Sequence, residues 1–446
     1  MEQDSDAPKG NLYTKIIFIL FGVASLLGWN ALLTELDFFD FFLHSMNPYV
    51  SFSFLNYILN IGFLCLLMIK KDLFSLKFQL IGGIVGSIAF LIFIPTFTII
   101  LEKDSFVNRF ITGTLVVLMG FINALCSGGF FNLVSYFPLE MIVSLSTGQG
   151  FSGIAMNVLQ YIVLLSITSN DMENNNEKKR IYTIRGWVFF SISSFILLIC
   201  LILLLLNYNS PYFQYYLKKN KESSKDEATK GLIEGEEDQD NIKDNIKDNI
   251  KDNIKDNINE SSGLTITKPE LSFYELFSKI WDLNLLMAYI YIVTFALFPN
   301  ASINQDLFNL KTKNRNYNSN TIILIYNLFD TIGRYLVAKV KPTKKLNLIV
   351  IFGRSILLFT LIFNYCCQVT LKFNINLTSI LLIINVAALA ATNGIGTTLC
   401  FGIAPNEVED EYKGQVGTSL SFFLIVGIFL GACFSYLTNA IMNSFS

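Results

Sequence analysis

Histidine is almost missing from this sequence, since His44 is the only one among 446 residues. The seven cysteines lie in or beside apolar runs, and no Cys-x-x-Cys pattern occurs. A zinc site or a disulfide scaffold needs such residues clustered at short, regular spacings, so we expect neither. The sequence also lacks a Ser/His/Asp set and a phosphate-binding glycine loop. We therefore predict that the chain is not an enzyme and holds no metal or cofactor.

Charged residues are also scarce. They make up 15% of the chain, whereas a soluble globular protein carries about 25%. Hydrophobic residues reach 52%, with 41 phenylalanines, and long apolar runs recur from end to end. The net charge of -2 argues against a nucleic-acid-binding surface. The composition predicts an all-α, polytopic membrane protein that lies in the lipid bilayer.

Eleven apolar runs have close to the ~20 residues that a helix needs to cross a bilayer. The predicted spans are 13–34, 49–69, 78–101, 108–134, 142–167, 182–208, 280–300, 320–340, 346–366, 378–402 and 417–441. Residues 1–12 lack the basic region and cleavage site of a signal peptide, so we expect a cytoplasmic tail and a retained first span.

The spans fall into two groups. Residues 13–208 hold six spans and residues 280–446 hold five. Between them, residues 209–279 are largely polar and include four tandem Asn-Ile-Lys-Asp units at 241–256. A four-residue charged period gives no wide apolar stripe, so we predict a disordered cytoplasmic loop. A 6+5 division is typical of two halves packed around a central path.

Lysine and arginine in short loops predict the orientation. The loop after the second span holds Lys70, Lys71 and Lys77, and the loop after the eighth holds four lysines. The loop after the first span has only acidic charges. These loops place the N-terminus in the cytoplasm and the C-terminus outside, although basic residues at 178–185 and 311–315 argue the other way. We expect a monomer in the plasma membrane.

The run from 321 to 340 contains the most unusual residues of the chain. Asp330 and Arg334 are four apart, so on a helix they share one face and can pair, and Asn327 extends that face. A charge at membrane depth costs roughly 2.5–3.5 kcal/mol on insertion scales. Such groups persist where they face a bundle interior or a watered cavity. Two interpretations stay open: a polar substrate path, or a structural ion pair between helices.

Other polar groups interrupt the apolar runs. Trp29 is typical either of the aromatic belt or of a surface that stacks on a flat ligand, and Asn30 can bond a neighbouring helix. Gln149 lies between two glycines that permit close backbone approach. Arg354 either snorkels towards the cytoplasm or supports packing. With Asn393, these groups suit a neutral, polar, partly aromatic solute.

At these residues the chain resembles the equilibrative nucleoside transporter family. Asn327, Asp330 and Arg334 are similar to its Asn-x-x-Asp-x-x-x-Arg pattern in the eighth span. Four further matches are Thr147-Gly148-Gln149-Gly150 with Pro138 eleven residues before Gln149, Gly28-Trp29-Asn30 where the family has Pro-Trp-Asn, Thr392-Asn393-Gly394, and the terminal run 417–436. The Asn- and Lys-rich repeat is similar to those of protozoan members. The resemblance covers nearly all spans.

The resemblance implies a major-facilitator-like arrangement of eleven helices. It also implies facilitated diffusion of purine nucleosides, and in some members nucleobases, by rocking of a six-helix and a five-helix half. Leu26 and Trp29 would line the site from the first span, and Asn327, Asp330 and Arg334 from the eighth. In the fourth span, Ser127 stands where many members have a glutamine that reads the base. The support residues would be Asn30, Gln149, Arg354 and Asn393.

Three other functions remain open at this stage. Because Asp330 is a carboxylate, it can carry a proton, which would make the chain a proton-coupled nucleoside or nucleobase transporter. A second alternative is a non-transporting receptor or scaffold that recruits partners through residues 209–279. A third is a transporter of another polar solute, such as a sugar, against which Trp29 argues by favouring a planar base.

Overall fold

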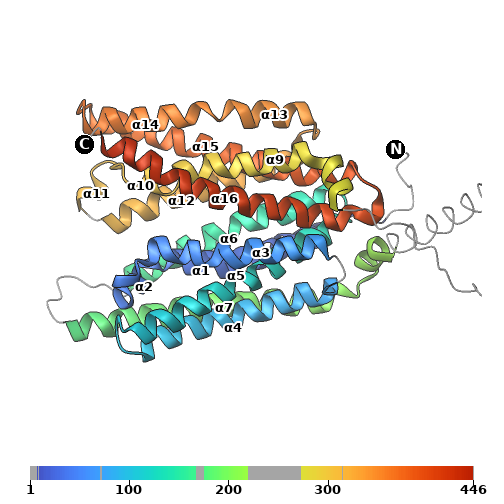
Figure 1. The fold of residues 1–446 in the computed structure, drawn as a ribbon, viewed down its shortest axis with the longest axis horizontal. Helices are drawn as coiled ribbons and strands as arrows, with labels where there is room; N and C mark the ends of the chain where they lie inside the picture. The colour runs from blue at the N-terminus through green and yellow to red at the C-terminus, as the bar shows by residue number, and fades with distance from the viewer. Residues whose placement is uncertain are drawn as a thin grey trace, which may run out of the picture.

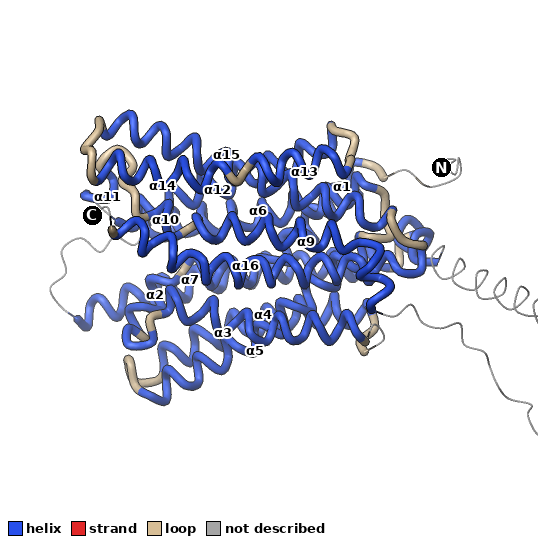
Figure 2. Tube along the Cα trace, turned by 45° about the horizontal axis from the view of Figure 1, so that its top comes forward, coloured by secondary structure: helices blue, strands red, loops and turns tan. Residues whose placement is uncertain are grey.

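A computed structural model describes the chain over residues 8, 10–70, 73–166, 175–218, 273–313 and 315–444. These residues form helices joined by short loops, and no strand occurs among them. The Asn-Ile-Lys-Asp repeats at 241–256 lie outside the described residues. Figure 2 shows the helices running along one long axis with the loops gathered towards the two ends.

Polar caps mark several helix starts. The Asn11 side chain accepts from Thr14 N at 2.8 Å where α1 begins, and Ser105 caps α5 in the same way. Up to residue 218 the helices are α1 (Leu12–Thr34), α2 (Leu36–Phe42), α3 (Pro48–Ile69), α4 (Leu76–Ile100), α5 (Phe106–Val134), α6 (Leu139–Ser166) and α7 (Asn175–Tyr208). A capping oxygen satisfies one of the backbone N–H groups that a helix leaves free at its start.

The second group of helices follows residue 272. It comprises α9 (Phe273–Leu297), α10 (Asn300–Ile303), α11 (Leu310–Lys313), α12 (Arg315–Leu336), α13 (Lys344–Gly353), α14 (Ile356–Val369), α15 (Ile375–Ile403) and α16 (Lys413–Asn443). In Figure 1 these yellow to red helices form one layer, and the blue to green helices of the first group form the other. The all-α class expected from the sequence is confirmed among the described residues.

Ten of the described helical segments are long and apolar enough to cross a membrane, by length and composition alone. Among the long described helices, the one outside that set is α6, which has 28 residues and carries many buried hydroxyl and amide groups. It lies between the layers, packed along α1 on one side and α12 on the other. That α6 also crosses the membrane, which would give eleven spans in a 6+5 arrangement, therefore stays a prediction.

The segment 209–279 is not a disordered loop at its two ends, contrary to the prediction. Residues 211–218 are helical, and α9 begins at Phe273. Phe213 is buried and stacks on Phe18 of α1, with ring centroids 5.3 Å apart. An aromatic pair of this kind contributes about 0.5–1.5 kcal/mol beyond its buried area. Apolar side chains within a mainly polar segment explain why these ends fold.

Several contacts join the two groups of helices. Helix α6 packs on α12, and α16 packs on both α3 and α5. Near the ends of α5 and α15, the rings of Phe131 and Phe401 are stacked with centroids 3.6 Å apart. Near the end of α6, the hydroxyls of Tyr161 and Thr321 are 2.8 Å apart. The two halves therefore touch at both ends of α6 and its neighbours.

Candidate functional site

The charged pair predicted from the sequence forms within α12. Arg334 Nε donates to Asp330 Oδ2 at 2.7 Å, and both side chains are buried, with 5% and 8% of their surface exposed. One helical turn brings residues four apart together, so this contact needs no other part of the fold. The pair turns inward into the bundle, as the cost of charge in lipid requires.

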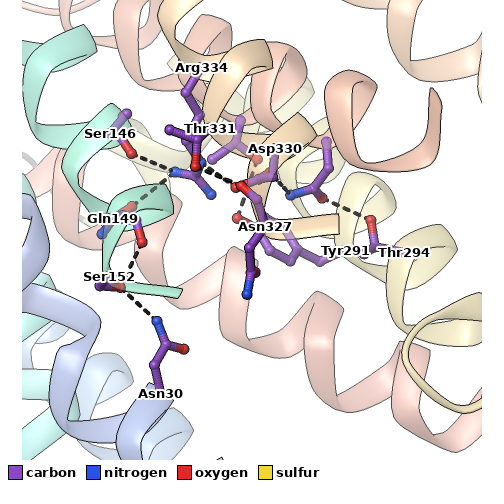
Figure 3. A network of polar contacts seen from close by, with 12 residues as sticks. Asn30, Ser146, Gln149, Ser152, Tyr291, Thr294, Asn327, Asp330, Thr331 and Arg334 are labelled. Carbon is purple, nitrogen blue, oxygen red and sulfur yellow. Dashed lines mark hydrogen bonds and ion pairs between the residues drawn. The ribbon is translucent and has the colours of Figure 1, made fainter. Parts of the chain in front are cut away.

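Arg334 also reaches across to the first half. Its Nη1 donates to Gln149 Oε1 of α6 at 3.1 Å and approaches the Ser146 carbonyl at 3.4 Å (Figure 3). A buried guanidinium has five N–H donors to satisfy. Nε donates to Asp330 within α12, and Nη1 donates to two groups of α6 in the other half. The pair is thus part of the contact between α6 and α12.

Asp330 is held from the opposite side by α15 and α9. Asn393 Nδ2 donates to Asp330 Oδ1 at 2.8 Å, and Thr294 Oγ1 donates to Asn393 Oδ1 at 2.8 Å. Each carboxylate oxygen therefore has its own donor. Figure 3 shows Asp330 between Arg334 on one side and Thr294 on the other. A carboxylate with donors on both oxygens has a fixed orientation, which a binding site requires.

Arg354 does not snorkel, because it is only 1% exposed. It lies at the break between α13 and α14, inside the segment that was expected to be one continuous span. Its guanidinium donates to the carbonyls of Ile290 and Leu389 and, at 2.6 Å, to Thr294 Oγ1. Helices α9 and α15 thereby hold it. Its contacts are those of a residue that supports Asn393 and, through it, Asp330.

The amides of α1 and α6 join these two helices to each other. Gln149 Nε2 donates to Ser25 Oγ at 3.0 Å, and Asn30 Nδ2 donates to Ser152 Oγ at 2.6 Å. The backbones approach so closely that a Cβ on Gly148 would collide with the Ile19 carbonyl oxygen. This contact explains the glycine before Gln149 in the sequence pattern, since only glycine fits there.

A second glycine serves the same purpose beside the charged pair. A Cβ on Gly394 of α15 would collide with the Asp330 carbonyl oxygen of α12. The close approach of these two helices brings the Asn393 amide within hydrogen-bonding distance of the Asp330 carboxylate. The glycine and the asparagine of the sequence pattern therefore act together: one permits the approach and the other uses it.

The remaining predicted site residues make separate contacts. Trp29 is buried against Tyr57 of α3 in an edge-to-face arrangement, with centroids 5.6 Å apart, and Leu26 is half-buried. Ser127 donates to the Asn123 carbonyl of its own helix at 2.7 Å. Asn327 donates to Asn157 Oδ1 of α6 at 2.6 Å, rather than to Asp330. In this conformation Ser127 and Asn327 are hydrogen-bonded to partners other than the Asp330–Arg334 pair.

Sequence reasoning missed several members of the network. Ser25, Ser152 and Thr294 each bond a carbonyl of their own helix as well as a distant side chain, so nothing in the sequence marks them out. Tyr291 of α9 was missed too. It lies beside the charged pair in Figure 3, and Thr397 Oγ1 donates to its hydroxyl at 3.3 Å. Its spacing of three residues from Thr294 is the one available signal, because both then share a helix face.

Comparison with known proteins identifies relatives over most of the chain. A family model described as "Nucleoside transporter" matches residues 113–440. Equilibrative nucleotide transporter 4 of Arabidopsis thaliana is 24% identical over 442 residues, covering 96% of this chain and 95% of that one. Equilibrative nucleoside transporter 1 of Homo sapiens is 23% identical over 377 residues, covering 80% and 76%.

Two solved structures share the fold. The proton:xylose symporter XylE bound to 6-bromo-6-deoxy-D-glucose aligns with a TM-score of 0.59 at 11% identity, covering 96% of this chain and 95% of that one. The major facilitator superfamily transporter FucP in its outward conformation aligns with a TM-score of 0.52 at 14% identity, covering 97% and 96%. At such low identity these similarities establish the architecture alone.

Proposed function

This chain belongs to the nucleoside transporter family, and from that premise we propose that it carries purine nucleosides, and also nucleobases, by facilitated diffusion. It is a multi-pass integral membrane protein built as a transporter, not as an enzyme. The solute crosses unchanged and moves down its own gradient. Two halves that alternately open to either side around a central site suffice for this, with no cofactor.

One observation carries the proposal: the buried pair in α12 has partners in both halves. Arg334 bonds Gln149 of α6, and Asp330 bonds Asn393 of α15. A site that rocking halves expose alternately must lie where the halves meet. An ion pair that only stabilised one half would not need a hydrogen bond from its arginine to the other half. The arrangement therefore favours a substrate site over a purely structural role.

The chemistry of the pair suits a ribose. Asp330 accepts hydrogen bonds from hydroxyls, and Arg334 donates to hydroxyl oxygens or to a base edge. We assign the flat base to the α1 side, where Leu26 and Trp29 supply apolar and aromatic surface. Ser127 would read the base edge with its single hydroxyl, and Asn327 would complete the site beside Asp330.

Substrate would enter by exchange of hydrogen bonds. When the halves separate, the bond from Arg334 to Gln149 and the bond from Asn327 to Asn157 must break, because each joins α12 to α6. An unsatisfied buried donor is costly, by about 1–3 kcal/mol. Substrate hydroxyls and ring nitrogens offset that cost by taking the vacated positions. Binding thus stabilises the intermediate in which the halves are apart at one end.

We further propose that the protein is a monomer in the plasma membrane, with the N-terminus in the cytoplasm and the C-terminus outside. The loop with Lys70 and Lys77 and the loop with Lys339 and Lys341 support this orientation through their positive charge. In Figure 1, α2 lies at the same end of the molecule as the C-terminus, which is the outer end in this assignment.

Uptake measurements test the proposed function. Radiolabelled adenosine and, separately, hypoxanthine are offered to cells that lack endogenous purine carriers and express the wild type, Asp330→Asn or Glu102→Gln. Glu102 is exposed, so its variant is a matched carboxylate-to-amide control. We expect saturable uptake in the wild type and the control, and loss of uptake in Asp330→Asn with the protein still in the membrane.

The same assay separates the alternatives. Competition by adenosine but not by glucose distinguishes a nucleoside carrier from a sugar carrier. Accumulation above equilibrium under an inward proton gradient would contradict facilitated diffusion and support proton coupling. Absence of uptake of either purine, with the protein at the cell surface, would contradict purine transport altogether. It would leave transport of another polar solute or the receptor hypothesis.

A further inference from the structure

A buried carboxylate lies outside the network around Asp330. Glu35 directly follows α1, just past the end of the first span, and is only 6% exposed. Burying an ionised carboxylate is expensive unless charges or donors compensate for it. None of the steps proposed for substrate binding uses this residue, so its place in the structure needs its own explanation.

Glu35 lines a small pocket where four helices meet. Its cavity of about 20 Å³ has room for roughly one water molecule. Asp37 of α2 lines it too and is half-buried, so the pocket lies close to solvent. The other lining residues are Gln160, Val163 and Leu164 of α6 and Tyr182 and Arg185 of α7.

Gln160 brings an unused acceptor to this pocket. Its Nε2 donates to the Thr34 carbonyl at 2.6 Å and so joins α6 to the last turn of α1. Its Oε1 is buried and has no hydrogen-bond partner among the described residues. A buried acceptor calls for a donor. An ionised carboxylate can only accept, whereas a protonated one has an O–H to donate.

The charges around Glu35 favour its neutral form. Burial raises the pKa of Glu35 most, and the negative charge of Asp37 raises it further. The positive charge of Arg185 opposes both effects. Together they raise the pKa of Glu35 from 4.5 to about 8. On α2, Asp40 adds a second negative charge and pairs with His44. Three further titratable groups lie around these carboxylates. Tyr49 donates a hydrogen bond to Asp37, Tyr182 lies beside them, and Lys103 lies over the Phe41 ring.

We propose that Glu35 and Gln160 form a proton-binding site at this end of α1. A proton from solvent adds to a carboxylate oxygen of Glu35, and the resulting O–H donates to Gln160 Oε1, directly or across one water. No other bond forms or breaks, and the only ligand is the proton. In the ionised state both groups are acceptors, so neither can donate to the other.

Proton binding would strengthen the contact between α1 and α6. These helices are already joined by Asn30 to Ser152 and by Gln160 to the Thr34 carbonyl. The neutral Glu35 adds a further link at their common end. Because its pKa is raised in the folded state, the stability that it contributes is full below about pH 4.5 and is lost as the pH rises through about 8. Acid therefore tightens this end of the first half.

A thermal unfolding series tests the site on the purified full-length protein in detergent. The unfolding midpoint is measured between about pH 5 and about pH 9 for the wild type, Glu35→Gln and Glu102→Gln. Glutamine resembles the neutral acid and can donate to Gln160. We expect the midpoint of Glu35→Gln to fall less with rising pH than that of the wild type, while Glu102→Gln follows the wild type. Equal pH dependence in wild type and Glu35→Gln would overturn the proposal.

Two further measurements test the site even if Glu35→Gln folds poorly. Gln160→Leu removes the acceptor that stabilises protonated Glu35. The fall of the unfolding midpoint with rising pH should therefore occur at lower pH in this variant than in the wild type. Infrared spectra of the wild type should contain the carbonyl band of a protonated carboxylic acid near neutral pH, and the band should disappear as the pH rises through about 8. If no such band exists, Glu35 binds no proton in this range and the proposal fails. Neither readout depends on purine transport, so the two proposals can fail separately.

Discussion

Arg334 of α12 and Gln149 of α6 are joined by a buried hydrogen bond of 3.1 Å between Nη1 and Oε1. The two residues belong to opposite halves of the molecule, and Arg334 simultaneously holds Asp330. Movement of α6 away from α12 must therefore break a bond to the charged pair itself. Separation of the halves and access to the proposed site are then one event.

Removing either member of the charged pair is expected to abolish uptake. Asp330→Asn loses the charge that holds Arg334, and Arg334→Ala leaves the carboxylate buried without its cation. Breaking a buried pair costs about 3–5 kcal/mol, so protein at the membrane must be measured beside adenosine uptake. We expect loss of uptake that exceeds any loss of protein.

The double variant Asp330→Ala/Arg334→Ala separates the two interpretations of the pair. It removes both charges, so neither is stranded and folding is less impaired than in the single variants. If the pair binds substrate, the double variant is present in the membrane but inactive. Recovered transport in the double variant would show that the pair is structural.

The hydroxyl of Thr294 is expected to matter beyond its own helix. It accepts from Arg354 and donates to Asn393, so Thr294→Val leaves buried groups without partners at nearly constant volume. Each unsatisfied group costs about 1–3 kcal/mol. Thr114→Val is the control, because Thr114 is exposed and bonds only a carbonyl of its own helix. We expect a lower unfolding midpoint and slower uptake for Thr294→Val alone.

The close approach of α1 and α6 is tested by adding one methyl group. Gly148→Ala places a Cβ against the Ile19 carbonyl, so the helices must move apart. Overpacking typically costs about 1–3 kcal/mol. Gly62→Ala is the matched change, since a Cβ there meets open space, and alanine favours a helix by about 0.5–1 kcal/mol. Equal unfolding midpoints for the two variants would contradict the described packing.

The orientation is tested with epitope tags at the two termini. With the N-terminus in the cytoplasm and an odd number of spans, a C-terminal tag binds antibody on intact cells. An N-terminal tag then binds antibody only after permeabilisation. Both tags accessible on the same side would mean an even number of crossings, and α6 would be the first helix to re-examine, because its polar composition separates it from the other ten segments.

Part of this architecture is readable in the sequence because it depends on short-range geometry. Asp330 and Arg334 pair as expected, since four residues make one helical turn. Apolar runs of about twenty residues likewise predict helices of membrane length without knowledge of their neighbours. The inward direction of the pair follows from the cost of charge in lipid.

Contacts between distant segments were not readable in the same way. The partner of Arg334 on α6 depends on how the two halves dock. Thr294 carries no local signal, and Tyr291 has only its spacing of three residues from Thr294. Arg354 was placed near a helix end by its position in an apolar run, but a break between α13 and α14 buries it among carbonyls. The end of the polar segment folds because Phe213 finds Phe18, a partner almost two hundred residues away.

The network at the centre contains two guanidinium groups, Arg334 and Arg354, beside the single carboxylate Asp330. This part of the described chain therefore carries net positive charge inside the membrane. Fixed positive charge raises the energy of any cation that enters, as it does in channels that exclude protons. A neutral solute meets no such barrier. In the proposed cycle this charge opposes the leak of cations when the site is open to either side.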